Sequence, residues 1–445
     1  MAEVSVIGVG MVSALGENTR TSWQNLLAGR SGIKLVSPQT LWGNGNVWRS
    51  PDPHLNESLN SPIPLAQIAP DLDLPLAPSR PIALLEKAVL EAIDDAGLSA
   101  PLPQNFANCA VIVGSSRSNQ AMVENLLQQV QNPESYIVVN SETLGKNWLY
   151  SLPASISSYI AQRLGCDHSF VTSTMAACAS GNLALAQGYE YLQRGLGDLV
   201  VVGATDAAIT PLTLAGFKRL GIYSQHQLKP FDRQRDGLVL GEGAAAVILA
   251  TADFAAKYQA YYGIKPPYYG QVMSWAATND ANHATSSDQH QSMAQEAINQ
   301  CLRKVGLSPS AIDLISTHGT GTPMNDFHEA YLIQQIFGVV PELQPYISAT
   351  KGATGHLLGA TGLMEAIFLL LTLENQILPP CVGLTEPDFA LRLIHETTIL
   401  ERDSLDDRLK DGLNYGLNMS FGFGGQNVAV VFKGIYNARK PQCNA

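Results

Sequence analysis

The sequence predicts an α/β fold in which strands and helices alternate along two related halves of the chain. Segments with strand character and segments with helical periodicity follow one another through most of the 445 residues, a pattern typical of layered α/β proteins. Hydrophobic residues make up 46% of the chain and charged residues 15%, which is the composition of a chain with a large buried core. A similar series of segments occurs twice, so we divide the chain into halves at 1–255 and 256–445.

Five strands are predicted in the first half, each a short run of apolar and β-branched residues. They cover residues 4–9, 110–114, 169–173, 199–203 and 244–249. Helices are predicted at residues 83–96, 153–164 and 180–193. In the last of these, Leu185, Tyr189 and Leu192 are spaced i, i+4, i+7 and give the helix one apolar face. The proline-rich stretch 34–81 lacks a sustained period and is predicted to be an elaborated loop.

The second half repeats this series of segments. Its predicted strands cover residues 269–275, 314–317, 346–349, 415–419 and 428–432. Its predicted helices cover residues 292–304, 326–336 and 362–373. Because each half supplies five strands with helices between them, the sequence predicts a duplicated fold with its seam near residue 255.

Composition and charge exclude several classes of protein. The net charge of −11 leaves no global basic surface for nucleic acid. The N-terminal segment lacks the basic and apolar regions of a signal peptide, and the apolar stretch 360–373 is too short and is interrupted by Glu365, so no membrane span is expected. The six cysteines lack a Cys-x-x-Cys pair, which argues against a disulfide framework and against a zinc site. We therefore expect a cytoplasmic protein without a bound metal.

Cys178 lies where a β-branched strand ends, small residues follow and a helical pattern begins. A thiol at a helix N-terminus is close to unpaired N–H groups and to the positive end of the helix dipole. We therefore expect a lowered thiol pKa, and one unit of lowering raises the thiolate fraction about tenfold. The alternative is a buried structural cysteine.

His318 and His356 each follow a predicted strand and have glycines beside them. Such glycines free the backbone around the imidazole, although a lone histidine is more often structural. Three sites of this kind, counting Cys178, favour a common catalytic centre over three independent structural residues. The remaining histidines have no comparable setting and are interpreted as structural: His54, His168, His226, His283, His290, His328 and His395.

Two glycine patterns resemble cofactor motifs without completing them. Gly8 and Gly10 follow a strand, but Ser13 stands where a dinucleotide turn needs a third glycine. Gly352 and Gly355 are not followed by the Lys-Ser/Thr of a phosphate loop. No resident nucleotide cofactor is expected.

Seven segments in a fixed order resemble the β-ketoacyl-acyl-carrier-protein synthases of the elongating, Cys-His-His class. They are residues 7–16, 27–33, Ala-Cys-Ala-Ser-Gly at 177–181, residues 229–243, His-Gly-Thr-Gly-Thr-Pro-Met-Asn-Asp at 318–326, residues 351–362, and Ser-Phe-Gly-Phe-Gly-Gly at 420–425. Each segment is weakly specific by itself, and all of them in this order are highly specific. The resemblance implies the thiolase fold, with five layers (αβαβα) built from two duplicated halves, usually as a homodimer.

The resemblance also implies the chemistry. Cys178 would carry the acyl group, and His318 and His356 would assist decarboxylation of a malonyl unit. Lys351 and Glu365 match the ion pair that supports the histidines. The product would be a β-ketoacyl thioester in fatty-acid chain elongation.

Further residues match substrate-contacting positions of the same family. Thr320 and Thr322 match contacts to the pantetheine arm, and Phe421 is assigned with them to substrate binding. Phe423 matches an aromatic gate, and the backbone N–H groups of Cys178 and Phe423 would form the oxyanion hole. The phosphopantetheine arrives on an acyl-carrier protein together with the acyl and malonyl thioesters, so no bound cofactor is required.

Related activities fit the sequence less well. Thiolases need a second cysteine in the C-terminal glycine-rich turn, and this chain has no cysteine at 420–425. Initiating synthases have Asn at the position of the second histidine, where this chain has His356. Three departures from the family pattern, Ala176, Met419 and Gln426, leave the acyl preference open. Two alternatives remain: a stand-alone ketosynthase for a polyketide or specialised lipid, and a non-catalytic chain-length partner in a heterodimer, against which Cys178 argues.

Overall fold

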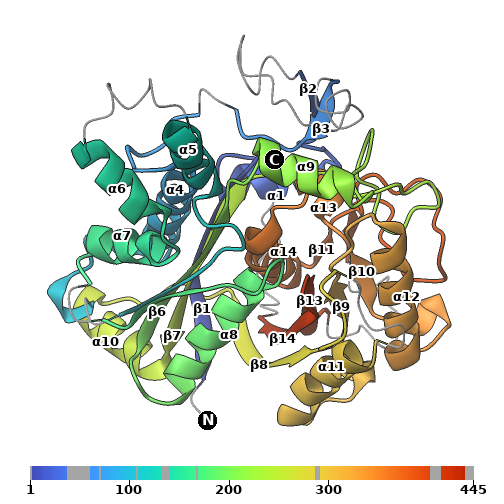
Figure 1. Ribbon diagram of the computed structural model, residues 1–445. Coiled ribbons are helices and arrows are strands. Elements are labelled where there is room, and N and C mark those ends of the chain that lie inside the picture. The colour runs from blue at the N-terminus through green and yellow to red at the C-terminus, as the bar shows by residue number, and fades with distance from the viewer. Residues whose placement is uncertain are drawn as a thin grey trace.

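A ten-stranded sheet runs through the computed structural model, from one half of the chain into the other (Figure 1). The structure describes residues 3–37, 61–69, 72–106, 109–131, 141–166, 169–285, 291–400 and 412–435. The first half contributes β1 (Val4–Ser13), β4 (Ala110–Gly114), β5 (Val171–Thr174), β6 (Leu199–Asp206) and β7 (Gly243–Thr251). The second contributes β8 (Gly270–Asn279), β9 (Leu314–Ser316), β10 (Tyr346–Ser348), β13 (Tyr415–Gly422) and β14 (Gln426–Gly434). All ten predicted strands are confirmed, with shifted ends.

The two halves share one strand topology. The order is β5-β4-β6-β7-β1 in the first half and β10-β9-β13-β14-β8 in the second. In each, the last strand along the chain, β7 or β14, runs antiparallel to both neighbours. Only two residue pairs join β1 to β8, which makes the sheet continuous. The predicted seam near residue 255 falls inside α10 (Ala252–Tyr262) and stays a prediction.

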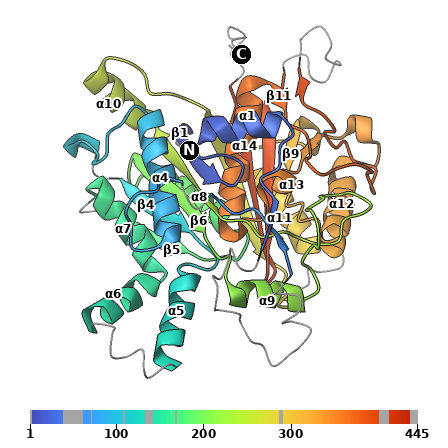
Figure 2. The same cartoon turned by 90° about the horizontal axis from the view of Figure 1, so that it is seen from above.

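Helices separate the two halves of the sheet and cover its outer faces. α8 (Ser180–Gln193) and α14 (Thr361–Asn375) pack against each other at the centre, α8 against β4 and β6 and α14 against β13. α4 (Arg80–Asp95) and α7 (Ala154–Leu164) cover the first half, and α11 (Ser292–Lys304) covers β8 and β14 of the second (Figures 1 and 2). The predicted five layers are therefore confirmed.

α14 is apolar on almost every side because it lies in the core, with Glu365 as its buried charged residue. Over residues 358–375 its mean hydropathy reaches 1.3, enough for a membrane span by length and composition, but 89% of that stretch is buried. A Cβ at Gly181 of α8 would lie 2.8 Å from the Leu363 nitrogen of α14, so glycine permits this close helix contact. A helix apolar on every side is expected between two sheets.

Several elements were not predicted from the sequence. They are α1 (Thr19–Leu27), α5 (Gln120–Gln131), α6 (Ser141–Ser151), α9 (Pro211–Arg219), α10, and the short strands β11 (Ile377–Leu378) and β12 (Thr398–Ile399). Stretch 34–81, predicted as a loop, contains an antiparallel pair, β2 (Lys34–Val36) and β3 (Ile63–Leu65). The rest of that prediction at 38–60 and 70–71, together with His54, His168 and His290, lies outside the described residues.

Candidate active site

Cys178 lies on a tight turn between β5 and α8. Ala177 has a φ of 49°, a left-handed conformation that non-glycine residues seldom adopt. The Ser180 hydroxyl holds the turn, since it accepts the Ala176 N–H at 2.9 Å and donates to the Ala177 carbonyl at 2.6 Å. The sequence therefore places the sulfur at the end of the strand, directly before the helix.

The expected lowering of the Cys178 pKa is wrong. Burial raises the pKa of this thiol to about 12, and the nearby charges of Lys351 and Arg117 offset only part of that effect. The side chain is 9% exposed, so the thiolate would lose almost all of its hydration. Cys178 is therefore a thiol at neutral pH, and its proton must leave as the sulfur reacts.

His318 follows β9, and the side-chain carboxyl group of Glu329 fixes the backbone around it. Glu329 accepts the N–H of His318 at 2.6 Å and that of Gly319 at 2.7 Å. In the described part of the protein, His318 Nδ1 is buried and has no hydrogen-bond partner. A buried polar atom of this kind suits a substrate or a water molecule.

His356 lies beyond β10 and α13 (Lys351–Thr354), after a sharp turn at Gly355. Gly355 has a φ of 69°, and a Cβ there would lie 2.5 Å from the Cβ of Ala66. The His356 Nδ1 is 3.1 Å from the Thr361 hydroxyl, which orients the ring and leaves Nε2 free to face the site. Glycine is thus needed for the chain to bring this imidazole inward.

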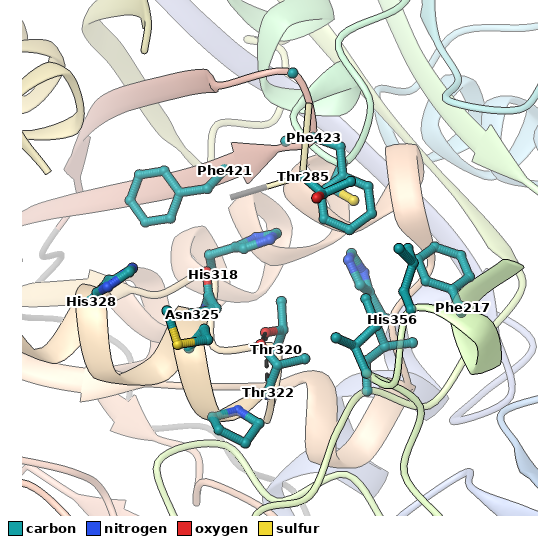
Figure 3. Close-up of a pocket in the computed structure, with 18 of the residues that line it drawn as sticks. Phe217, Thr285, His318, Thr320, Thr322, Asn325, His328, His356, Phe421 and Phe423 are labelled. Carbon is teal, nitrogen blue, oxygen red and sulfur yellow. Dashed lines mark hydrogen bonds between the residues drawn. The ribbon is translucent and has the colours of Figure 1, made fainter. Parts of the chain in front are cut away.

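The structure brings Cys178, His318 and His356 together. One side-chain ligand atom from each lies within 4.8 Å of the others. The two imidazole rings are 5.5 Å apart between centroids and nearly perpendicular, and Figure 3 shows both directed into one cavity. His318 and His356, which lie 140 and 178 positions after Cys178 in the sequence, therefore form a single cluster with it.

A buried ion pair stands behind the histidines. Lys351 Nζ lies 2.8 Å from Glu365 Oε1, and both side chains are almost fully buried. Burial lowers the pKa of His318 and of His356 well below the usual value, and the Lys351 charge lowers both further. Both imidazoles are therefore neutral at pH 7.

A cavity of about 330 Å³ opens onto these three residues. Thr320 and Thr322 line it, with their hydroxyls 2.8 Å apart. Phe421 and Phe423 also line it, and the Phe421 ring lies 5.7 Å from that of His318 (Figure 3). Every side chain assigned from the sequence to substrate contact therefore lies in the wall of one pocket.

Several pocket residues were not selected from the sequence. Phe217 lines the cavity and its ring lies 6.3 Å from that of Phe423. His328 and Asn325 of α12 (Pro323–Phe337) also line it, so the interpretation of His328 as a purely structural residue overlooked its position. Both lie in the first two turns of the helix that follows the His318 motif and are three residues apart on one face, a spacing that could have identified them.

One buried acidic side chain, Asp206, holds the loops around the site through hydrogen bonds. Asp206 accepts hydrogen bonds from the Ser115 hydroxyl and from the N–H groups of Ser116, Arg117 and Gly359. It therefore ties loops from both halves of the chain together. Sequence reasoning missed this aspartate because nothing local distinguishes it from a strand-end residue.

The three departures from the family pattern lie beside the pocket. Ala176 precedes the strained turn, Met419 is fully buried in β13, and Gln426 begins β14. None of the three lines the cavity in the part of the chain that the structure describes. Any effect of these residues on the acyl preference would have to act through neighbouring residues.

Comparison with known proteins agrees with the geometry. Residues 1–255 match the family model "Beta-ketoacyl synthase, N-terminal domain", and residues 269–385 match "Beta-ketoacyl synthase, C-terminal domain". A putative mitochondrial 3-oxoacyl-[acyl-carrier-protein] synthase of Schizosaccharomyces pombe is 29% identical, over 97% of this chain and 99% of the relative. The 3-oxoacyl-[acyl-carrier-protein] synthase 2 of Vibrio cholerae is 28% identical, over 97% and 98%.

A solved structure has the same fold. The complex titled AntDE:AntF, a type II PKS acyl-carrier protein with its ketosynthase, aligns with a TM-score of 0.79 and 22% identity over 98% of this chain and 100% of the other. The thiolase fold implied by the sequence resemblance is therefore confirmed. With the family models covering most of both halves, the chain belongs to the β-ketoacyl synthase family.

Proposed function

We propose that this enzyme condenses an acyl thioester with malonyl-acyl-carrier protein to give a β-ketoacyl-acyl-carrier protein in fatty-acid elongation. The observation that carries the proposal is the contact of one thiol with two neutral imidazoles in a buried pocket. A thiol supplies the nucleophile for acyl transfer, and neutral imidazoles can accept or donate protons and hydrogen bonds.

In the first half-reaction the Cys178 sulfur attacks the carbonyl carbon of the acyl thioester. Its pKa of about 12 means that the proton leaves during attack, to a neighbouring neutral imidazole. The C–S bond to the carrier arm then breaks, the carrier thiol takes the proton, and the acyl group remains on Cys178. Backbone N–H groups of Cys178 and Phe423 would stabilise the oxyanion.

In the second half-reaction the malonyl thioester loses CO₂. The electron pair of the C–C bond that breaks stays on the thioester and forms an enolate. With the Thr361 hydroxyl donating to His356 Nδ1, Nε2 carries the proton and can donate to the enolate oxygen. His318, buried opposite, would provide the second donor. The enolate carbon attacks the acyl carbonyl, the C–S bond to Cys178 breaks, and the leaving thiolate takes a proton from water, because the proton that Cys178 lost in the first half-reaction left with the carrier thiol.

We propose that neither a metal nor a resident cofactor takes part. Cys178, His318 and His356 have the ligand types of a zinc site. The buried ammonium of Lys351, however, already lowers the pKa of both imidazoles through its positive charge. It would likewise oppose a second cation between them. Thr320 and Thr322 would instead bind the pantetheine arm brought by the carrier.

We propose an acyl-carrier protein as partner and the cytoplasm as compartment. The AntDE:AntF structure contains a carrier protein with its ketosynthase. Here, α9 ends in Lys218 and Arg219 beside Phe217 and Leu220 of the pocket wall. An acidic carrier would need such a local basic patch, because the enzyme itself carries a net charge of −11.

We also propose a homodimer formed through the edge strand β5. Among the residues that the structure describes, β5 has one neighbour in its sheet, and the flanking Phe170 and Met175 are 51% and 54% exposed. Antiparallel pairing of two β5 strands would cover this edge under two-fold symmetry. Light scattering should then give twice the 47.7 kDa of one chain.

The pathway has one alternative. A polyketide ketosynthase would use the same residues, and the AntDE:AntF complex comes from such a pathway. Its sequence identity of 22% supports the fold alone, whereas the relatives named 3-oxoacyl-[acyl-carrier-protein] synthase match over 97% of the chain. A non-catalytic chain-length partner would not require the buried cysteine and ion pair that this chain has.

The two half-reactions provide the test. Wild-type enzyme incubated with acyl-carrier should carry the acyl group on Cys178, as located by peptide mapping. His318→Ala and His356→Ala should still be acylated, while condensation falls about 10²–10⁴-fold. Acylation at another cysteine, or both variants condensing within a few-fold of wild type, would overturn the mechanism. A ladder of acyl lengths in the same assay separates fatty-acid from polyketide substrates.

A further inference from the structure

Cys109 and Cys166 form a buried pair of thiols that the condensation site does not use. Cys109 directly precedes β4, and Cys166 follows the C-terminal end of α7. Their sulfur atoms are 2.8 Å apart, and the side chains are 1% and 6% exposed. A disulfide bond is about 2.05 Å long, so a closure of about 0.8 Å would join them.

We propose that Cys109 and Cys166 form a reversible intramolecular disulfide when the protein is exposed to a small peroxide. One thiol reduces hydrogen peroxide, releases water and becomes a sulfenic acid. The second thiol attacks that sulfur and releases a second water as the S–S bond forms. Two thiols and one peroxide thus give one disulfide and two waters. A dithiol reductant reverses the step and itself becomes a disulfide.

Both cysteines are attached to backbone that holds them in place. The Cys166 N–H donates to the Ala161 carbonyl at 2.9 Å, after the left-handed cap residue Gly165. Cys109 leads into β4, which pairs with β5 on one side and β6 on the other. Because the two sulfurs are already positioned, bond formation does not require the chain to search for a partner.

The other described cysteines have different contacts. Cys301 Sγ lies 3.1 Å from the Ser274 hydroxyl, and Cys381 Sγ donates to the Ile347 carbonyl at 3.4 Å. Oxidation of either would not place a second sulfur beside it. The hydrogen bond with Cys166, together with burial, raises the pKa of Cys109. Oxidation should therefore be faster at pH 9 than at pH 7, because the thiolate is the reactive form.

The bond would cross-link the far end of the sheet from the active site. Cys109 precedes the first residue of β4, whereas Cys178 lies beyond the C-terminal ends of β4 and its neighbour β5. The five residues of β4, at about 3.3 Å each, therefore separate Cys109 from that end of the sheet by about 17 Å. Condensation should therefore stay within about twofold in the oxidised protein. The bond would close a loop between residues 57 positions apart. This restricts the unfolded chain and should raise the Tm by about 4–8 °C.

The test is a thiol count on native protein treated with hydrogen peroxide and then denatured. Wild type should fall from six thiols to four, with a linked peptide joining Cys109 to Cys166, and dithiothreitol should restore all six. Because peroxide could also reach the pocket, the experiment is repeated in Cys178→Ser, which should fall from five to three. Cys301→Ala, a matched control, should also lose two thiols.

Two results would overturn the proposal. One is native protein that keeps every thiol, or that oxidises Cys109 and Cys166 to sulfinic acids without linking them. The other is a linked peptide that joins different cysteines. Cys109→Ala should lose both the linked peptide and the rise in Tm. If that variant fails to fold, the linked peptide and reversible Tm shift of wild type still decide the question.

Discussion

Replacing Lys351 with methionine should produce a loss of stability that grows with pH. The ammonium is fully buried and lies 2.8 Å from Glu365. Burial raises the pKa of Glu365 to about 7 even with this charge beside it, because Lys351 offsets only part of the desolvation. Without Lys351, the carboxyl group should keep its proton to a still higher pH. The proton then replaces the missing positive charge wherever the pH allows it.

The magnitude follows from proton linkage. In the unfolded chain Glu365 titrates near its ordinary value of 4.5. Between pH 4.5 and 7 the folded wild type and the folded variant both hold the extra proton, so their difference in stability is constant. Above pH 7 only the variant still does, and because its folded state binds more protons than its unfolded state, stability falls by about 1.4 kcal/mol per pH unit. From pH 7 to 9 the added loss is therefore at most about 2.7 kcal/mol, slightly less than the 3–5 kcal/mol typical of breaking a buried ion pair.

The assay is denaturant unfolding at pH 6, 7, 8 and 9, with condensation measured in parallel. Lys351→Met should show the rising loss, and Lys351→Met/Glu365→Gln should not, because the titrating carboxyl is gone. Both should condense about 10²-fold more slowly, since neither has a cation beside the histidines. Lys257→Met is the matched control: its ion pair with Asp198 is exposed, so it should cost under about 1 kcal/mol without a pH trend. A pH-independent loss in Lys351→Met, or near-wild-type condensation by the double variant, would refute the reasoning.

Three further predictions concern turnover, docking and pH. Cys178→Gln, whose amide resembles an acylated cysteine in the oxyanion hole, should release CO₂ from malonyl-carrier without condensing it; absence of CO₂ would contradict this. Lys218→Glu with Arg219→Glu should slow turnover of carrier-bound substrate and weaken its salt dependence, while a pantetheine thioester is spared; equal losses would indicate a folding defect. Burial raises the pKa of Glu329 to about 8, so wild-type stability should fall between pH 5 and 8, and denaturation midpoints of Glu329→Gln should fall less steeply.

The periodic parts of the fold were predictable because their patterns are local. Strands such as β4, β6 and β7 are runs of mainly apolar residues that the sheet buries, and α8 and α11 were predicted to the residue. α9 was missed although Thr210 caps its first turn and Pro211 begins it, a recognised start signal. α10 was missed because the helix is only partly buried, so apolar residues recur along it with only a weak helical period.

The candidate site was predictable in its residues but not in its electrostatics. Cys178, His318 and His356 each have a local glycine or small-residue setting that the sequence displays. The sign of the Cys178 pKa shift depends on how completely the folded protein removes water, which no local pattern records. Cys109 and Cys166 were hidden for the same reason, because 57 residues separate two sulfurs that the fold brings together.

Burial sets the resting protonation state of all three site residues. The same desolvation that raises the pKa of Cys178 lowers those of His318 and His356, so the resting site holds a neutral thiol and two neutral bases. With a pKa of about 12, Cys178 rests almost entirely as the neutral thiol at pH 7. Acyl transfer must couple proton loss to attack, and the imidazoles must stay unprotonated to accept that proton. Burial keeps them unprotonated, the Lys351 charge lowers their pKa further, and Glu365 holds Lys351 in place. The ion pair is therefore part of the acid–base chemistry, although neither of its members needs to touch the substrate.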